Sequence, residues 1–425
     1  MPIPPLRHPA IRMGGRDPDE EHRVSTPLEL FFDLTFAIAF GVASAELAGT
    51  LAAGHVGAGL LGFAFAMFAV IWAWINFSWF ASAYDTDDWI FRLVTMVQMV
   101  GVLLLAMGIQ PLFTSLVQGN HVDNGVMVMG YVVMRLALVF QWLRAARQDP
   151  DRRAVCLRYA KYLAIAQAGW VAIIFIPADV PLMFAMITPL FVLEMVTPLI
   201  AERGLATPWH AHHIAERYSL LTIIALGECL VGTIDTLRVV VAGSPWTVDA
   251  AVLGLAGTGL AFAMWWLYFI FPAGPSLHLR RNRAFVFGYS HILIFSAIAA
   301  TGAGLHVFAY YLAGQAQIGE VAVVATVAVP VAVFALTLTV VYAYMVGPDP
   351  LHAWLLAAAC LMTGGAVALA ATGVDVTVCL LLILFAPSVS IVADELVGHR
   401  RRAAALARLE AHYGEPGRRA RTPEQ

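Results

Sequence analysis

The sequence predicts an all-α fold, a polytopic bundle of about twelve transmembrane helices. Hydrophobic residues make up 60% of the 425-residue chain and charged residues 12%, whereas soluble domains carry about 25% charged residues. The mean hydropathy is +0.77. Apolar runs of about 20 residues, the length that crosses a hydrocarbon core of roughly 30 Å, recur along the chain. Backbone groups in lipid must be satisfied within the protein, so these runs form helices.

The apolar runs fix the order of the predicted helices. The spans cover residues 28–48, 57–80, 90–110, 125–145, 158–177, 181–200, 214–236, 248–271, 285–311, 321–346, 352–372 and 374–396. Residues 1–24 are polar and rich in proline, with no short apolar core before a cleavage site, so we expect no removable signal peptide. Residues 399–425 form a basic tail, and no segment outside the membrane is long enough to fold alone.

Basic residues fall almost entirely on one side of the predicted membrane, whereas the other side carries only Arg238. They are Arg7, Arg12, Arg16, Arg23, Arg92, Arg144, Arg147, Arg152, Arg153, Arg158, Lys161, Arg203, Arg217, Arg280, Arg281, Arg283 and the tail from Arg400 to Arg421. By the positive-inside rule, both termini are predicted to be cytoplasmic. Arginines of the tail are expected to meet anionic lipid headgroups, at about 1 kcal/mol per charge.

The cysteine pattern and the composition limit the classes of cofactor and partner that we expect. The four cysteines are scattered without a C-x-x-C spacing, which indicates neither a disulfide framework nor a zinc ribbon. We expect no cofactor and no nucleic acid partner, and the net charge of −3 carries no information about partners. The expected partners are the lipid bilayer and a small ion or solute, and a homo-oligomer stays open.

Similar segments suggest an internal repeat of two six-helix halves, residues 25–203 and 204–398. The matching pairs are Glu29–Thr35 with Glu216–Thr222, Trp74–Phe77 with Trp266–Phe269, and Arg92 with Arg283. An even number of spans per half gives both halves the same orientation. The repeat would therefore be parallel, about an axis along the membrane normal.

Few ionisable side chains remain inside the predicted spans, because each costs about 2.5 to 3.5 kcal/mol at mid-bilayer. The candidate ion- or proton-binding groups are Asp33, Glu228, Glu29, Glu194 and Glu216. Their candidate charge partners are Arg135, Arg92 and Arg217, of which Arg135 is the deepest cation. The sequence assigns no catalytic residue and leaves a metal open.

Two of these acids lie on one face of the first span, because Glu29 and Asp33 are four residues apart. They could bind a cation or relay protons, or Glu29 could reach the interface while Asp33 pairs with a neighbouring helix. Glu228 follows Gly227 in span seven and has no basic residue within a turn. A desolvated carboxylate of this kind suits proton exchange near neutral pH. The alternative is an ion pair between Glu228 and Arg135.

A polar cluster is predicted near the cytoplasmic surface. Its members are His210 and His213 before span seven, Asp85, Asp87 and Asp88 after span two, and His291 two turns into span nine. Two histidines one turn apart with Glu216 a turn later have a tolerable spacing for zinc, although a polar interfacial cluster is the favoured interpretation. The three aspartates could hold a hard cation, cap span three, or pair with Arg92 and the arginine-rich loop of the other half.

Aromatic residues and prolines add two expectations. Trp72, Trp74, Phe77, Trp79 and Phe80 are interpreted as an interfacial belt at the end of span two. The prolines are expected to interrupt the last helix of each half. Discontinuous helices at matching places in two halves often mark the binding site of a transporter. They are Pro189, Pro198 and Pro387.

Together these motifs resemble the bacterial low temperature requirement A (LtrA) family over essentially the whole chain apart from its tails. The motifs are Glu29-Leu-Phe-Phe-Asp33, Tyr84-Asp-Thr-Asp-Asp88, His210-x-x-His213-x-x-Glu-Arg217 leading into Thr222-Ile-Ile-x-Leu-Gly-Glu228, and Tyr289-x-His291. The resemblance implies a multi-pass protein of the bacterial cytoplasmic (inner) membrane, associated with growth at low temperature and so with a stress response. It implies no defined biochemical activity.

A fainter likeness concerns the first helix, where Phe31-Phe-Asp33-Leu-Thr-Phe36-Ala-Ile-Ala39 is similar to the lysosomal and bacterial potassium channels built from six-helix repeats. Their signature is Phe-Ser-Asp followed by Phe-Ala-Ile. Phe32 replaces the serine here, while Tyr218-Ser219-Leu220 keeps a serine and loses the aspartate. The likeness implies that spans one and seven line a central path.

The residues favour permeation or secondary transport of a small ion or solute, with Asp33 and Glu228 binding the cation or proton. The major-facilitator class is disfavoured, because residues Tyr84–Asp88 stand where its Gly- and Arg-rich loop would be. An enzyme acting on a lipid through the polar cluster is the less favoured alternative. A membrane scaffold without transport is the remaining one.

Overall fold

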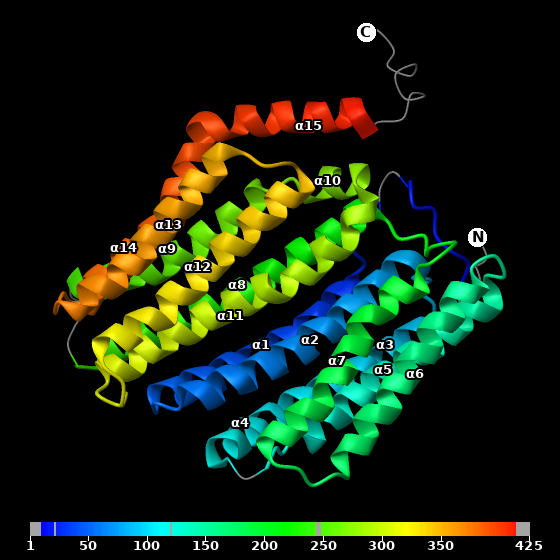
Figure 1. Ribbon diagram of the computed structural model, residues 1–425, viewed down its shortest axis with the longest axis horizontal. Coiled ribbons are helices and arrows are strands. Elements are labelled where there is room, and N and C mark those ends of the chain that lie inside the picture. Colours follow the sequence, from blue (N-terminus) through cyan, green and yellow to red (C-terminus); the bar gives the residue numbers. More distant parts are fainter. Residues whose placement is uncertain (1–9, 21–22, 120, 244–247, 414–425) are drawn as a thin grey trace, which may run out of the picture. The chain divides into compact units, whose positions relative to one another are not determined.

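The computed structural model describes residues 10–20, 23–119, 121–243 and 248–413. Arg7, Arg418, Arg419 and Arg421, which contribute to the charge asymmetry, lie outside the described residues. The chain divides into two compact units (Figure 1). Unit 1 comprises Met1–Glu46 and His55–Arg217, and unit 2 comprises Leu47–Gly54 and Tyr218–Gln425. The described residues contain helices and no strand, which confirms the all-α fold class.

The helices follow the predicted spans closely. In chain order they are α1 (Pro27–Ala52), α2 (Val56–Tyr84), α3 (Trp89–Met107), α4 (Ile109–Gln118), α5 (Gly125–Gln148), α6 (Arg153–Ile174), α7 (Val180–Ala201), α8 (Ala211–Gly243), α9 (Val248–Ile270), α10 (Ala273–Leu279), a 3₁₀ turn (Arg281–Arg283), α11 (Ala284–Leu312), α12 (Glu320–Met345), α13 (Pro350–Ala371), α14 (Val376–Ala393), a π-helical turn (Asp394–Gly398) and α15 (His399–Tyr413). Predicted span three corresponds to α3 and the start of α4, which Gly108 separates.

Within the described residues, 11 helical segments are long and apolar enough to cross a membrane. The predicted span that falls outside this set is α6, because Arg158 and Lys161 in its first turns lower its hydropathy. Its 22 residues are nevertheless long enough to cross a core of roughly 30 Å. The chain is therefore a multi-pass membrane protein, and twelve spans stay a prediction.

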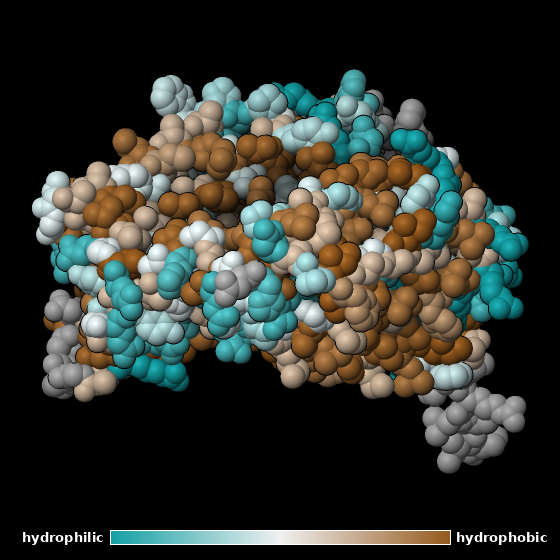
Figure 2. Space-filling model, turned by 60° about the horizontal axis from the view of Figure 1, so that its bottom comes forward, coloured by the Kyte–Doolittle hydropathy of each residue, from teal (hydrophilic) through white to brown (hydrophobic). Residues whose placement is uncertain are grey.

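Large apolar side chains point outward as well as inward. Phe175, Trp354 and Leu361 are 78%, 75% and 76% exposed, and Figure 2 shows apolar residues over much of the visible surface. In water such a surface would favour aggregation. In a bilayer it meets acyl chains, so the pattern fits a protein surrounded by lipid.

Capping aspartates set the start of several helices. Asp88, Asp179, Asp349 and Asp375 precede α3, α7, α13 and α14, and each side chain accepts a hydrogen bond from a backbone N–H of the first turn. Such caps satisfy donors that have no partner within the helix.

In unit 1, α5 packs between α3 and α6, and α6 packs against α7. In unit 2, α11 to α14 pack in chain order, and α14 also packs against α9.

The prolines do not interrupt the helices, so that expectation was wrong. Pro189 and Pro198 lie inside the continuous helix α7, and Pro387 lies inside α14. A proline removes one backbone hydrogen bond, and neighbouring helices and hydroxyls can compensate for the loss in a membrane. The threonine before each α7 proline, Thr188 or Thr197, donates its hydroxyl to a carbonyl one turn earlier.

One further expectation needs correction. The aromatic residues of α2 form no interfacial belt, because Trp72, Trp74, Phe77 and Phe80 are fully buried inside unit 1.

The first 15 residues of the basic tail form a helix, α15. Alanine, leucine, arginine and glutamate dominate this segment and have high intrinsic helix propensity.

Close packing of α8 on α11 generates a testable prediction. A Cβ atom at Gly302 would lie 2.7 Å from the carbonyl carbon of Glu228, and such overpacking costs about 1 to 3 kcal/mol. We expect Gly302→Ala to lower the midpoint of thermal unfolding in detergent. Gly364→Ala is the matched control, because nothing lies within 4 Å of its Cβ position. Equal midpoints for the two variants would contradict the packing.

Candidate functional site

Two carboxylates of α1 and two basic residues of α8 meet in the interior of unit 1. Glu29 and Asp33 are four residues apart, as are His213 and Arg217, so each pair shares one helix face. Arg217 Nη2 lies 2.5 Å from Asp33 Oδ1, and Arg217 Nη1 lies 3.2 Å from Glu29 Oε1. All four side chains are fully buried. Arg217 therefore joins both acids to α8.

Helix α2 supplies the third side of this site. Trp74 Nε1 donates to Asp33 Oδ1 at 2.6 Å, and Ser78 Oγ accepts a hydrogen bond from Arg217 at 3.3 Å. The guanidinium also lies 5.7 Å from the centre of the Trp74 ring, a favourable cation–π distance. Asp33 Oδ2, by contrast, is buried without a hydrogen-bond partner.

Glu29 has a structural role as well. Its carboxylate accepts a hydrogen bond from the N–H of Thr26 at 2.8 Å, while Thr26 Oγ1 accepts one from the N–H of Glu29. This reciprocal arrangement is a capping box at the start of α1. His213 Nε2 lies 3.3 Å from the same carboxylate. Glu29 thus connects the end of α1 to α8.

The charge of this site does not balance. Two carboxylates share one guanidinium, and a buried ion without full compensation costs several kcal/mol. One more positive charge, carried by a proton on Asp33, Glu29 or His213 or by a small cation, would make the site neutral. The arrangement is chemically able to take up and release such a charge.

A second buried ion pair lies between α5 and α7, also in unit 1. Arg135 Nη2 lies 2.8 Å from Glu194 Oε2, and both side chains are buried. Glu194 also accepts hydrogen bonds from Trp72 of α2 at 3.1 Å and from Gln167 of α6 at 3.0 Å. Arg135 additionally donates to the hydroxyl of Tyr131. Arg135 therefore pairs with Glu194, and the predicted alternative of a pair with Glu228 was wrong.

Glu228 stands apart from these pairs, in the middle of α8 in unit 2. It is 8% exposed, and no side chain or backbone group of the described residues forms a hydrogen bond or ion pair with its carboxylate. Helix α11 lies against its backbone at Gly302. Asp235, two turns further along α8, pairs with Arg238 and His306 instead.

The three aspartates between α2 and α3 are bound by protein groups. Asp88 caps α3, accepts a hydrogen bond from Ile11 and pairs with Arg144, while Asp87 pairs with the exposed Arg92 at 2.7 Å. Burial opposes ionisation of Asp88, but Arg144 and the backbone donors outweigh it and hold its pKa below the usual value.

Asp85 differs from its neighbours in its electrostatics. It is buried, its closest cationic group is Arg23 at 4.0 Å, and it accepts the N–H of Asp87. Burial, reinforced by the negative charge of Glu29, raises the pKa of Asp85 to about 6.

The remaining polar residues face protein groups. His210 Nδ1 accepts a hydrogen bond from the N–H of His213, and Glu216 accepts one from Ser25. His291 Nδ1 lies 2.7 Å from the carbonyl of Phe287 and therefore donates, so its Nε2 accepts from the Tyr268 hydroxyl. The described residues contain no group of three side chains able to hold a metal.

Sequence reasoning missed the neutral partners of the buried acids. Trp72 and Trp74 were interpreted as interfacial, and Tyr131 and Gln167 were not singled out. The sequence did contain a signal, because two tryptophans, Asn76 and Ser78 lie on one long apolar helix. Their side chains carry hydrogen-bond donors, which positions facing lipid or an apolar core do not need, so they indicated buried acceptors nearby. Which acid each would contact could not be inferred from the chain alone.

Comparisons with known proteins find a matching family and a similar sequence. Residues 24–387 match the family model described as bacterial low temperature requirement A protein (LtrA). An uncharacterised protein of Rhizobium meliloti (strain 1021) is 24% identical over 303 residues, which cover 67% of this chain and 69% of that protein. The matched family region contains both buried ion-pair sites and Glu228, whereas α15 lies beyond it.

The second ion pair yields a prediction about stability. Arg135→Met leaves the Glu194 carboxylate buried without a cation, which costs about 3 to 5 kcal/mol. The double variant with Glu194→Gln removes that charge and keeps an acceptor for Trp72, so we expect it to recover more than half of the loss. Arg92→Met, which breaks an exposed pair, should leave the thermal midpoint almost unchanged. Thermal unfolding in detergent measures all three, and a double variant as unstable as Arg135→Met would contradict the ion pair.

Asp85 yields a prediction about pH. Burial raises the pKa of Asp85 from the ordinary 3.8 to about 6. Between these two pH values, Asp85 is therefore protonated in the folded state and ionised in the unfolded state. Stability therefore falls as pH rises through this window, by at most about 3 kcal/mol. Asp85→Asn should abolish this loss: it should match the wild type near pH 4 and exceed it above pH 6. Parallel unfolding curves across this range would contradict the assignment.

Proposed function

The chain belongs to the family of bacterial low temperature requirement A proteins, and we propose that it moves a small cation, in the simplest case a proton, across the inner membrane. The proposal places both termini in the cytoplasm, in keeping with the distribution of basic residues. A contribution to growth at low temperature belongs to the same proposal.

The observation that carries the proposal is the unequal charge of the Arg217 site. Asp33 and Glu29 are both fully buried against one guanidinium, so neutrality requires one more proton or cation. Asp33 Oδ2 has no hydrogen-bond partner and is buried, which makes this atom the natural position for that proton. When Asp33 is protonated, Arg217 retains Glu29, so the site becomes charge-balanced.

Glu228 supports the same function in unit 2. Its carboxylate is nearly buried and lacks a cationic partner within the described residues. An unpaired acid in a span is retained at a cost of about 2.5 to 3.5 kcal/mol. Because packing alone would favour an apolar residue here, we attribute Glu228 to proton or cation binding.

A second candidate function is purely architectural, and the arginine clamps favour it. Arg217 and Arg135 each neutralise acids from other helices, and Glu29 belongs to a capping box. On this view the protein is a membrane scaffold. The two candidates differ at Asp33, because a scaffold needs its charge for stability and a carrier needs it for flux.

Reconstitution in liposomes tests the proposal. With a pH-sensitive dye inside and a potassium diffusion potential imposed, we expect proton uptake that Asp33→Asn or Glu228→Gln lowers at least about tenfold, because a side-chain amide does not ionise near neutral pH. Asp235→Asn, on the same helix as Glu228, and Asp87→Asn are matched controls that should keep the flux.

Stability measurements on the same samples separate the two candidates. We expect Asp33→Asn to keep the thermal midpoint of the wild type or raise it, since it leaves one carboxylate for one guanidinium. A large fall in the midpoint together with unchanged flux in Glu228→Gln would favour the scaffold and exclude the carrier.

A further inference from the structure

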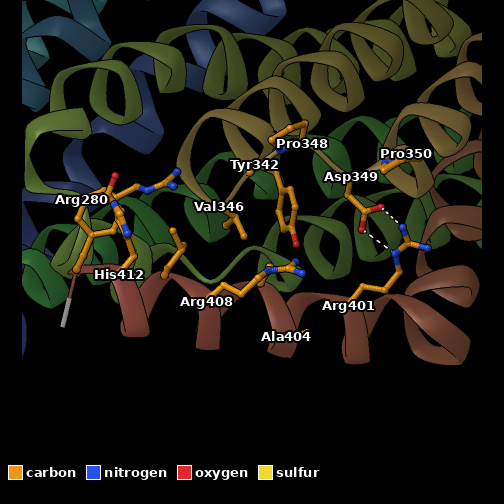
Figure 3. A pocket seen from close by; sticks show the side chains of 14 residues that line it. Arg280, Tyr342, Val346, Pro348, Asp349, Pro350, Arg401, Ala404, Arg408 and His412 are labelled. Carbon is orange, nitrogen blue, oxygen red and sulfur yellow. Dashed lines mark hydrogen bonds and ion pairs between the residues drawn. The ribbon is translucent and has the colours of Figure 1, made fainter. Parts of the chain in front are cut away.

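A cavity of about 760 Å³ lies beneath α15 in unit 2 (Figure 3). Arg280 at the end of α10, Tyr342 near the end of α12 and the loop from Val346 to Pro350 form one wall. One face of α15 forms the other wall, with Arg401 and Arg408 directed to the cavity. The lining of the cavity includes neither Glu228 nor any residue of the buried ion pairs described above.

The cavity has an excess of positive charge. Three arginines line it, and Asp349 is its single carboxylate. Arg401 already occupies that carboxylate, with nitrogens 2.7 Å and 3.0 Å from its two oxygens. Burial alone would raise the pKa of Asp349, but the N–H of Leu351 and Arg401 outweigh it and lower this pKa. Asp349 therefore stays ionised and neutralises Arg401 only.

The other two arginines of the cavity, Arg280 and Arg408, form no ion pair with a carboxylate of the described residues. Arg280 is fixed by the carbonyls of Tyr344 and Met345 at 3.2 Å and 2.9 Å, and its Nε is buried without a hydrogen-bond partner. Arg408 forms no hydrogen bond or ion pair with the described residues. His412 lies on the same wall of the cavity. Arg280 and Arg408 thus bring two guanidiniums without carboxylate partners to the lining of one cavity, and guanidinium groups suit an oxyanion with several oxygens.

The surroundings of the cavity indicate a lipid. The π-helical turn that joins α14 to α15 exposes Leu396 by 70% and Val397 by 51%, which suits insertion at the edge of a bilayer. Tyr342 also lines an apolar groove between α9, α12 and α13. The phosphate of a lipid would therefore meet the basic wall of the cavity, and its acyl chain would meet the adjoining apolar residues.

We propose that this cavity binds the phosphate of an anionic phospholipid headgroup, with Arg408 as the unpaired guanidinium that contacts it. The chemistry that the cavity recognises is a phosphate monoester or diester, and the exposed apolar turn and adjoining groove select the membrane lipid over a soluble phosphate. Binding would hold α15 against the end of α10, with which it packs.

Native mass spectrometry of the full chain, released from detergent, tests the proposal. We expect phosphatidylglycerol to be retained in preference to phosphatidylcholine. Arg408→Gln should lower this retention roughly fivefold, the effect of about 1 kcal/mol for one arginine at a membrane surface. Arg400→Gln is the matched control: it removes the same charge from the same helix, but Arg400 does not line the cavity. It should change retention less than about twofold, since only diffuse attraction is lost.

Three results would overturn the proposal. Equal losses in Arg400→Gln and Arg408→Gln would mean that the helix attracts anionic lipids only through its overall charge. Retention of both lipids to the same extent would exclude a site selective for an anionic headgroup, because phosphatidylcholine carries the same phosphodiester but no net charge. Displacement of phosphatidylglycerol by inorganic phosphate, with equal thermal stabilisation by phosphate alone, would assign the cavity to a soluble ligand. The thermal midpoint of each variant without added lipid establishes that it is folded.

Discussion

Neutralisation of acids inside an apolar bundle is the constraint on which unit 1 depends. Arg217 holds Asp33 across 184 residues of sequence, and Arg135 holds Glu194 across 59. In a bilayer most helices could exchange neighbours at little cost, because acyl chains are as apolar as their side chains. A buried carboxylate has no such freedom, since separating it from its guanidinium costs several kcal/mol. The ion pairs therefore select which helices must be neighbours, and apolar packing fills the remaining space.

The fold was largely predictable because lipid restricts the possible structures. A segment of about 20 apolar residues in a membrane must satisfy its own backbone, so composition alone gives the helices and most of their ends. The structure departs from prediction at the prolines, since α7 runs continuously through Pro189 and Pro198. Outside the predicted spans it adds α15, because alanine and arginine favour a helix outside the membrane too.

The candidate site was predictable only in part. Asp33, Glu29 and Glu194 stand out as ionisable residues in apolar runs, but a sequence does not show which cation each will meet. Arg135 was the deepest cation and Glu228 the acid without a local partner, so their pairing was a reasonable alternative; the helix packing instead places Glu194 beside Arg135. Trp72 and Trp74 were misinterpreted because a tryptophan at an interface and one that donates to a buried acid look alike in sequence.

The architectural and the transport interpretations of the Arg217 site are not equivalent, because both acids come from the same helix. Asp33 and Glu29 lie one turn apart on α1, and Arg217 contacts both. A clamp between helices needs only one of them. The second acid adds a buried negative charge that destabilises the site unless a proton or cation is present, and Asp33 Oδ2 has no other partner. Glu29 has a structural role of its own in the capping box and beside His213, so the charge that a purely stabilising clamp does not need is that of Asp33. Under the proposed function, protonation of Asp33 would leave Arg217 with Glu29 alone, and a proton-coupled movement would use that shift.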